Sequence, residues 1–244
     1  MTLSLIIPCL NEETRLPVTL GQIRAFRDAW KGSWSICEVI VVDDGSTDRT
    51  VETASAWGNR LPMVVLKHPH NRGKGAALRR GVQAAHGDFV LLYDADGATP
   101  IGEVEKLIAA LERAQATIAI GSRVLIGEAG EVRMEHHRRF IGRVYYWLTA
   151  SLIPGIHDAA CGCKLFRRDR AQCLFALQHI DRFAYDPEIL SLAIRFGDRI
   201  VEVPVRWNAI AGSKVNLFSD GIEMFWRVMG IYWRRMRDGT KKAK

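Results

Sequence analysis

Two aspartates that follow an apolar run are the first residues in this sequence that could carry chemistry. Residues 90–96 read Val-Leu-Leu-Tyr-Asp-Ala-Asp, so a buried strand is expected to end at Asp94 and Asp96. Residues two apart in an extended chain share a face, so both carboxylates can point at one hard cation. Mg²⁺ and Mn²⁺ are such cations and the usual partners of diphosphates. The alternative is a pair of solvated turn aspartates with no ligand.

Other apolar runs also end in polar loops. Strands are expected near 3–7, 38–42, 63–66, 117–121 and 201–207, with helices between most of them, including 76–85, 101–113 and 189–195. This alternation predicts right-handed βαβ crossovers and an α/β fold with a mostly parallel central sheet flanked by helices. Ligands of such sheets bind beyond the carboxyl ends of the strands. The side chains expected to meet there around a nucleotide diphosphate and its cation are Glu12, Asp43, Asp44, Lys74, Asp94, Asp96 and Arg123.

The composition fits one α/β domain with appendages. The chain has 244 residues, is 48% hydrophobic and 25% charged, and carries a net charge of +7. This charge favours polyanions, which include nucleotides, nucleic acid and acidic lipid headgroups, without choosing among them. Five cysteines, an odd count, fit free thiols in a reducing compartment. A metal site at Cys161-Gly-Cys163 is the alternative, although no second ligand pair accompanies it.

Apolar segments raise the question of membrane contact. The N-terminus lacks a basic flank and is not expected to be a signal peptide, and no stretch reaches the ~20 apolar residues of a membrane span. Two segments, 140–152 and 218–235, have apolar residues at helical spacing with tryptophan beside them. Each could pack on the protein core or lie on anionic lipid. We therefore expect a cytoplasmic protein, peripherally associated with the inner face of a membrane.

The last third of the chain is rich in basic residues. Residues 128–143 could form a mobile basic loop or a solvated surface segment, and Lys214 lies in a basic turn that could reach a phosphate. Asp186 and Glu188 precede a predicted helix, where negative charge is favoured, so they could be capping groups. We expect a main domain over 1–216, an amphipathic helix over 217–239 and a basic tail over 240–244.

Six motifs together resemble one enzyme family. They are Ile7-Pro8-Cys9-Leu10-Asn11-Glu12, Val41-Val42-Asp43-Asp44-Gly45-Ser46-Thr47-Asp48, Asn71-Arg72-Gly73-Lys74-Gly75, Asp94-Ala95-Asp96, Gly121-Ser122-Arg123 and Cys161-Gly162-Cys163-Lys164-Leu165-Phe166. In this order they resemble family 2 glycosyltransferases over about residues 3–216. Within that family the chain looks most like the polyprenyl-phosphate sugar transferases, the group of dolichyl-phosphate glucosyltransferases and dolichol-phosphate mannose synthases.

The resemblance implies a GT-A fold, a metal-dependent reaction and a set of site residues. By it, Pro8, Leu10, Glu12, Asp43 and Asp44 would line the base and ribose of a nucleotide-sugar donor, and Lys74 would serve the donor loop. Asp94, Ala95 and Asp96 would form the acidic motif, with Asp94 and Asp96 holding Mg²⁺ or Mn²⁺. Arg123 and Lys214 would handle the donor or acceptor phosphates.

Two positions depart from the mannose synthase pattern. Ala98 stands where those enzymes have a glutamine, which leaves one protein ligand fewer for a metal, and Asn208 stands where they have an arginine. The segments around both positions look more like the glucosyltransferase branch. This favours UDP-glucose as the donor over GDP-mannose, which remains the alternative.

The expected mechanism follows from charge. A cation on Asp94 and Asp96, aided by Lys74, would stabilise the departing nucleotide. A lipid monophosphate acceptor is already anionic, so Arg123 and Lys214 would only position it, and a single displacement would invert the anomeric carbon. If the acceptor were a hydroxyl, Asp186 would be the first candidate base. A nucleic-acid-binding module is the remaining alternative, but no RRM, KH or helix-turn-helix pattern supports it, and no nucleic-acid partner is expected.

Overall fold

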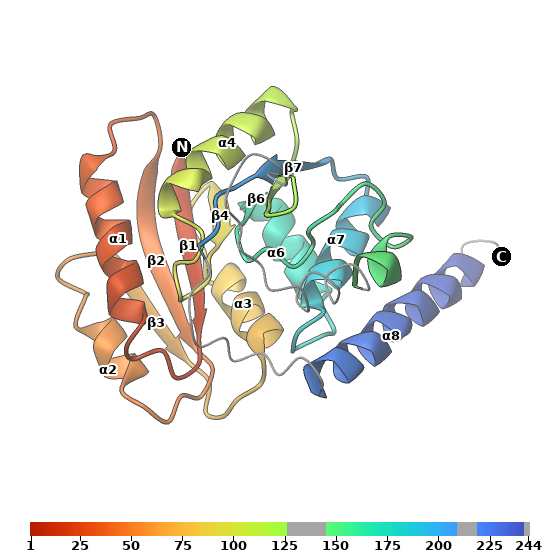
Figure 1. The fold of residues 1–244 in the computed structure, drawn as a ribbon, viewed down its shortest axis with the longest axis horizontal. Coiled ribbons are helices and arrows are strands. Elements are labelled where there is room, and N and C mark those ends of the chain that lie inside the picture. The colour runs from red at the N-terminus through yellow and green to blue at the C-terminus, as the bar shows by residue number, and fades with distance from the viewer. Residues whose placement is uncertain (126–144, 209–218, 242–244) are drawn as a thin grey trace.

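A single sheet runs through the centre of the protein. The computed structural model describes residues 1–125, 145–208 and 219–241. Within these residues the sheet has seven strands in the order β3-β2-β1-β4-β6-β5-β7 (Figure 1). The strands are β1 (Thr2–Cys9), β2 (Ser35–Asp43), β3 (Met63–Lys67), β4 (Phe89–Leu92), β5 (Ile118–Ser122), β6 (Lys164–Arg167) and β7 (Ile200–Pro204).

The strand directions confirm the predicted, mostly parallel sheet. Strands β1, β2, β3 and β4 are mutually parallel, and β5 is parallel to β7. Among the strands that the structure describes, only β6 runs the other way, pairing antiparallel with β4 and β5. Strand β7 lies at the edge of the sheet. Its Pro204 has no backbone N–H to donate, and an edge strand tolerates this because it pairs with a neighbour on one side only.

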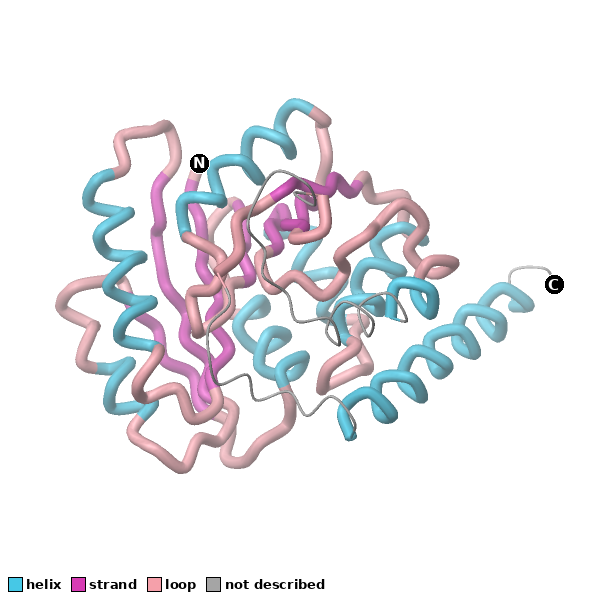
Figure 2. Tube along the Cα trace, in the orientation of Figure 1, coloured by secondary structure: helices cyan, strands magenta, loops and turns pink. Residues whose placement is uncertain are grey.

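Helices cover both faces of the sheet (Figure 2). On one face lie α1 (Leu16–Ala29), α2 (Thr50–Ser55), the short 3₁₀ helix η1 (Ile101–Glu103) and α4 (Val104–Arg113). On the other lie α3 (Lys74–Gln83), α6 (Arg168–Ala176), α7 (Tyr185–Arg195) and part of α8 (Ser219–Lys241). Each face therefore has its own hydrophobic core.

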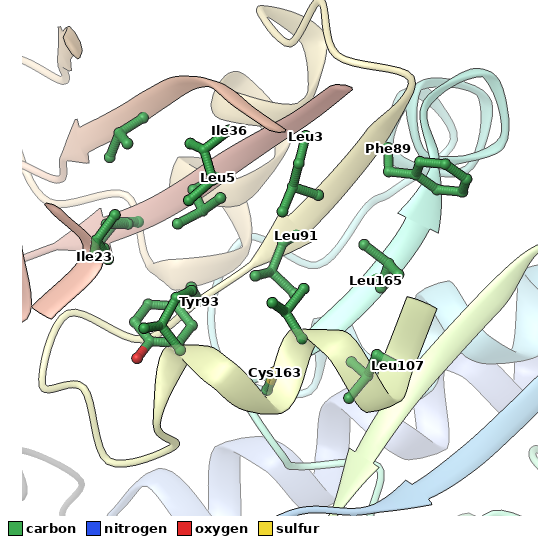
Figure 3. Close-up of a cluster of buried hydrophobic side chains, with 14 of the residues drawn as sticks. Leu3, Leu5, Ile23, Ile36, Phe89, Leu91, Tyr93, Leu107, Cys163 and Leu165 are labelled. Carbon is green, nitrogen blue, oxygen red and sulfur yellow. The ribbon is translucent and has the colours of Figure 1, made fainter. Parts of the chain in front are cut away.

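Strand alternation divides the apolar residues between these two cores. In β1, Leu3, Leu5 and Ile7 belong to the core under α1 and α4, whereas Ile6 belongs to the core under α3. Figure 3 shows part of the first core, where Leu107 of α4 lies among the strand residues. Each such fully buried side chain contributes about 1.5–3 kcal/mol to stability relative to exposure.

The predicted amphipathic C-terminal helix is confirmed as α8, which buries one face in the core and exposes the other. Val228 and Ile231 are buried in the core shared with α7, while Trp226 and Trp233 are both 67% exposed. Figure 1 shows α8 running past α7 and out toward the C-terminus. None of the described helices combines the length and apolar character needed to cross a bilayer. Of the other predicted amphipathic segment, residues 145–149 are helical and 140–144 lie outside the described residues.

The order of the strands fixes where a ligand can bind. Strand β1 pairs with β2 on one side and with β4 on the other, and all three are parallel. Their carboxyl ends therefore meet at one edge, at the point where the chain changes the direction in which it adds strands. The loops after β1, β2 and β4 carry Glu12, Asp44 and Asp94 to this point.

Candidate functional site

A cavity of about 280 Å³ opens at this edge of the sheet. Eight of the predicted donor-binding residues line it: Pro8, Leu10, Glu12, Asp44, Lys74, Asp94, Ala95 and Asp96. The remaining lining residues are Cys9, Arg15, Asn71, Gly73, Ala77, Arg182, Phe183 and Trp207. The structure therefore brings the acidic motif, the basic loop and the first strand's polar loop to one place.

The acidic loop after β4 is held by its neighbours. Thr19 Oγ1 on α1 donates to the Ala95 carbonyl at 2.7 Å, and the backbone N–H of Asn208 donates to the Ala98 carbonyl at 2.8 Å. Gly97 has φ +66°, which a glycine adopts without strain. The Asp94 and Asp96 carboxylates thus start from a fixed backbone.

Asp94 and Asp96 differ in their charge environment. Burial alone would raise the pKa of Asp94, but the Lys74 ammonium, whose Nζ donates to Asp94 Oδ1 at 2.6 Å, outweighs this and lowers it. Burial raises the pKa of Asp96, and the neighbouring Asp94 charge raises it further. Asp94 is therefore an anion with a fixed partner, whereas a bound cation would stabilise the ionised form of Asp96.

The two carboxylates suit a divalent cation that shares its ligands with a substrate. Mg²⁺ typically takes one or two protein carboxylates and completes its shell with phosphate oxygens and water. In the part of the chain that the structure describes, no group of three or more His, Cys, Asp or Glu residues could hold a metal by itself. Ala98, only 4% exposed, supplies no side-chain ligand. The donor set at Asp94 and Asp96 thus fits a cation bound together with a diphosphate.

Gly162 explains the Cys161-Gly162-Cys163 motif. A Cβ at position 162 would collide with the Asp94 carboxylate, so only glycine permits this approach. Both flanking thiols are free and buried, and burial raises the pKa of Cys161 to about 11. The motif therefore packs beneath the acidic loop as neutral thiols.

Two glycines let the loop around Lys74 dock closely. Gly73 has φ +112°, and a Cβ there would lie 2.5 Å from the Asp181 carbonyl oxygen. A Cβ on Gly75 would lie 2.6 Å from both Gln178 Nε2 and the Ile180 carbonyl oxygen. The segment before α7 thus braces the start of α3, which directs Lys74 toward Asp94.

The adjacent aspartates after β2 have different positions. Asp44 lines the cavity and accepts hydrogen bonds from His68 Nδ1 at 2.8 Å and from the backbone N–H of Gly73 at 2.7 Å. Asp43 is fully buried and accepts from the backbone N–H of Ser46 at 3.2 Å, outside the cavity lining. Asp44 is the member of the pair that can touch a ligand directly, and donor binding by Asp43 stays a prediction.

Arg15 is a cavity residue that the sequence analysis did not identify. Its Nε donates to Glu12 Oε2 at 2.7 Å, and its pKa is raised by this hydrogen bond, with a smaller contribution from the charge of Asp96. The pair is three residues apart at the entrance to α1. Arg15 thus adds a second cationic side chain, besides Lys74, to the lining of the cavity near Asp96.

Arg123 is not among the residues that line the cavity. Its Nε and Nη2 donate to the two carboxylate oxygens of Asp158, both at 2.7 Å, and its guanidinium lies 5.7 Å from the ring centroid of Trp207. Trp207 lines the cavity, whereas Arg123 does not. Arg123 therefore contacts a residue of the cavity lining without belonging to it, and phosphate binding by Arg123 stays a prediction.

Asp186 and Lys214 are the remaining predicted site residues, and Asp186 is not among the residues that line the cavity. Asp186, on the first turn of α7, forms an ion pair with Lys164, whose Nζ also donates to the Cys161 carbonyl at 2.5 Å. Lys164 is 1% exposed, so this pair is buried. Lys214 lies outside the described residues, as does the basic segment 128–143.

Other lining residues carried different amounts of signal in the sequence. Asn71 and Trp207 stand inside or beside segments that supported the family resemblance, and Arg15 follows Glu12 by one helical turn. Arg182 and Phe183 carried no such signal, because the loop between α6 and α7 reaches the cavity only through tertiary packing.

Comparisons with known proteins agree with this geometry. The model of the family described as Glycosyl transferase family 2 matches residues 4–175. The dolichyl-phosphate beta-glucosyltransferase ALG5D of Trichomonas vaginalis is 37% identical over 225 residues, which cover 88% of this chain and 68% of that protein. The dolichyl-phosphate beta-glucosyltransferase of Homo sapiens is 35% identical over 233 residues, covering 91% of this chain and 72% of that protein.

Solved structures share the fold. Glucosyl-3-phosphoglycerate synthase from Mycobacterium tuberculosis, crystallised with Mn²⁺, uridine diphosphate and phosphoglyceric acid, has a TM-score of 0.72 at 23% identity, over 96% of this chain and 78% of that one. Mannosyl-3-phosphoglycerate synthase from Rubrobacter xylanophilus has a TM-score of 0.72 at 18% identity, over 99% and 75%. These likenesses confirm the predicted GT-A fold. With a family model that matches most of its length and curated relatives at 35–37% identity, the chain belongs to glycosyl transferase family 2.

Proposed function

We propose that this glycosyltransferase moves glucose from UDP-glucose onto dolichyl or another polyprenyl phosphate, with inversion at the anomeric carbon. The observation that carries the proposal is the cavity in which Asp94, Asp96 and Lys74 stand beside Asp44 and the Glu12 loop. Relatives named dolichyl-phosphate beta-glucosyltransferase support the choice of sugar and acceptor.

Different residues of the cavity suit the different parts of a nucleotide sugar. Asp44 and Glu12, as hydrogen-bond acceptors, would serve the nucleoside. Lys74 would face the diphosphate, with Mg²⁺ or Mn²⁺ held by Asp94 and Asp96. When bound, that cation supplies stabilisation of the negative charge on the departing diphosphate. Lys74 adds a positive charge already fixed against Asp94, so little reorganisation is needed as the bond breaks.

The surroundings of Asp186 favour a phosphate acceptor over a hydroxyl. A hydroxyl needs a base within hydrogen-bond reach, and Asp186 is instead paired with buried Lys164, away from the cavity lining. A phosphate monoester is anionic at neutral pH and needs only to be held in position. We propose that Arg123 and Lys214 supply this positioning charge.

A lipid acceptor requires access to a membrane surface, and α8 offers a candidate contact. Trp226 and Trp233 are exposed on α8, and Trp147 is 78% exposed. The residue after Trp147, Leu148, accepts a hydrogen bond at its carbonyl from the Tyr232 hydroxyl of α8, so Trp147 lies close to this helix. Arginines 227, 234, 235 and 237 stand among these aromatic residues. Tryptophan and arginine together favour an interface with anionic headgroups, so we propose peripheral membrane contact through this side of α8.

The test is transfer of labelled sugar to a short polyprenyl phosphate. UDP-glucose and GDP-mannose are offered in parallel, each with and without Mg²⁺ or Mn²⁺, and a soluble alcohol serves as the alternative acceptor. Metal-dependent glucosyl lipid from UDP-glucose is the expected product. Product from GDP-mannose alone would overturn the donor, and product only on the alcohol would overturn the acceptor.

A further inference from the structure

His68 is a buried histidine that contacts Asp44 of the cavity lining, and the proposed reaction gives it no role. His68 follows β3 and is 3% exposed, and Asp44 is 4% exposed. His68 Nδ1 lies 2.8 Å from Asp44 Oδ1. A carboxylate oxygen is the acceptor in such a pair, so the hydrogen bond assigns the donor role to Nδ1.

The acceptor sites of Asp44 are almost fully used. Oδ1 accepts from His68 Nδ1 and from the backbone N–H of Arg72 at 3.0 Å, and Oδ2 accepts from the backbone N–H of Gly73 at 2.7 Å. An ionised carboxylate offers about four lone-pair sites, so these three donors leave about one, on Oδ2. Asp44 lines the cavity, so its carboxylate is the part of this hydrogen-bond network that borders a ligand there.

The loops that carry this pair are interlocked, which fixes the orientation of the carboxylate. The backbone N–H of His68 donates to the Asp43 carbonyl at 2.8 Å. Gly45 has φ +78°, and a Cβ there would lie 2.6 Å from the carbonyl carbon of His70. The loop after β2 and the loop after β3 are therefore in direct contact, and His68 is the side chain among the groups that join them through Asp44.

We propose that His68 is a positioning residue that aims the last acceptor site of Asp44 at the nucleobase, so that the site selects a base presenting an N–H donor. Uracil offers N3–H as a donor, whereas cytosine has a bare acceptor at the same position. If cytosine is bound, its N3 and the Asp44 carboxylate are both acceptors and neither finds a donor. Polar sites reject a ligand of nearly the same shape in this way. Guanine also presents a ring N–H donor, at N1, so this contact separates UDP from CDP without excluding GDP.

This inference rests on the proposed function in assuming that a nucleoside diphosphate occupies the cavity. Its test therefore measures binding alone, without sugar transfer. Calorimetric titration with UDP and with CDP, each with Mn²⁺, gives the two dissociation constants for the wild type. Two variants are compared with it: His68→Phe, which keeps a ring and removes the donor, and His68→Asn, which keeps an N–H at the δ position.

In the wild type, UDP is expected to bind at least about tenfold more tightly than CDP, the value of one hydrogen bond to a charged group. His68→Phe should bring this ratio close to one by weakening UDP, and His68→Asn should restore most of it. A purely structural role would lower the melting temperature and weaken both nucleotides equally. An unchanged ratio in a folded His68→Phe protein overturns the proposal, and failure of the wild type to bind any nucleoside diphosphate overturns the proposed function instead.

Discussion

Gly162 packs directly against the carboxylate of Asp94, so the Cys-Gly-Cys turn forms one wall of the acidic site. The contact joins residues 68 positions apart, and it leaves no space for even a methyl group on that turn. The position of Asp94 relative to Lys74 therefore depends on a backbone atom that belongs to no charged motif.

Gly162→Ala is expected to displace the Asp94 carboxylate and to lower kcat by about tenfold or more, since small misplacements of catalytic groups are costly. Steady-state kinetics of sugar transfer measure the effect. Gly155→Ala is the matched control for an added methyl, because a Cβ at Gly155 meets nothing within 4 Å, although its φ of +80° adds local strain. Equal activity of Gly162→Ala and the wild type would contradict the importance of this contact.

Asp96→Asn should reduce transfer by on the order of 10²-fold or more, because it removes one of two carboxylates offered to the cation. Retention of the circular dichroism spectrum and melting temperature would show that the fold survives. Asp28→Asn, on an exposed ion pair of α1 with Arg24, serves as the control and should be silent. Full activity in Asp96→Asn would exclude metal binding by this carboxylate.

Lys74→Met should lower kcat/KM by about 10²-fold, since a fixed positive charge beside the departing diphosphate is lost. The substitution also removes the charge that lowers the pKa of Asp94, so the acid limb of the pH–rate profile should move to higher pH. Lys67→Met, an exposed lysine at the end of β3, is the matched control. An unmoved acid limb would argue against coupling between Lys74 and Asp94.

Asp158→Asn should destabilise the protein by on the order of 3 kcal/mol at neutral pH, because it leaves the partly buried Arg123 without its carboxylate. Burial alone would raise the pKa of Asp158, but the Arg123 hydrogen bonds and charge lower it below the value of an unfolded aspartate. Because the pKa is lower in the folded protein, the pair stabilises the fold at pH values above the unfolded pKa of about 3.9. This stabilisation is lost as the pH falls through the folded pKa.

The difference in unfolding free energy between wild type and Asp158→Asn should therefore shrink as the pH falls below the pKa of a free aspartate. Urea denaturation over a series of pH values measures this difference. A difference that stays constant into acid would mean that the pair does not supply the stability.

The double variant Trp226→Ser/Trp233→Ser should bind anionic vesicles at least about tenfold more weakly, since each exposed tryptophan loses apolar contact with the lipid. Vesicle sedimentation gives the affinity. Val18→Ser is the control, because Val18 is 62% exposed on α1, on the opposite face of the sheet from α8. Equal binding by the variant would remove α8 from the membrane contact, with sugar transfer to a short-chain acceptor expected to persist either way.

Local patterns in the sequence were sufficient to predict the mostly parallel α/β sheet. The apolar runs that became β1, β2, β4 and β5 end close to where they were expected, because buried strands demand continuous apolar residues and loops demand polar ones. The carboxylates at the ends of β2 and β4 followed from the same reasoning, since parallel strands place their carboxyl ends together.

Tertiary structure decided the features that depend on contacts between distant segments. Which of Asp43 and Asp44 faces the cavity depends on the turn after β2, and no periodicity distinguishes them. The pairing of Asp186 with Lys164 joins α7 to the interior strand β6, and Asp186 is not among the residues that line the cavity.

The sequence by itself determined the class of fold, the edge of the sheet where ligands bind and the identity of the acidic and basic groups there, because these follow from short-range spacing. Only the tertiary structure decided that Arg15, Phe183 and Trp207 complete the cavity, that Arg123 contacts Trp207 without lining the cavity, and that α8 buries one face and exposes another. These outcomes depend on how separate elements pack, and packing is settled by the shape and burial of the whole chain rather than by any one stretch of it.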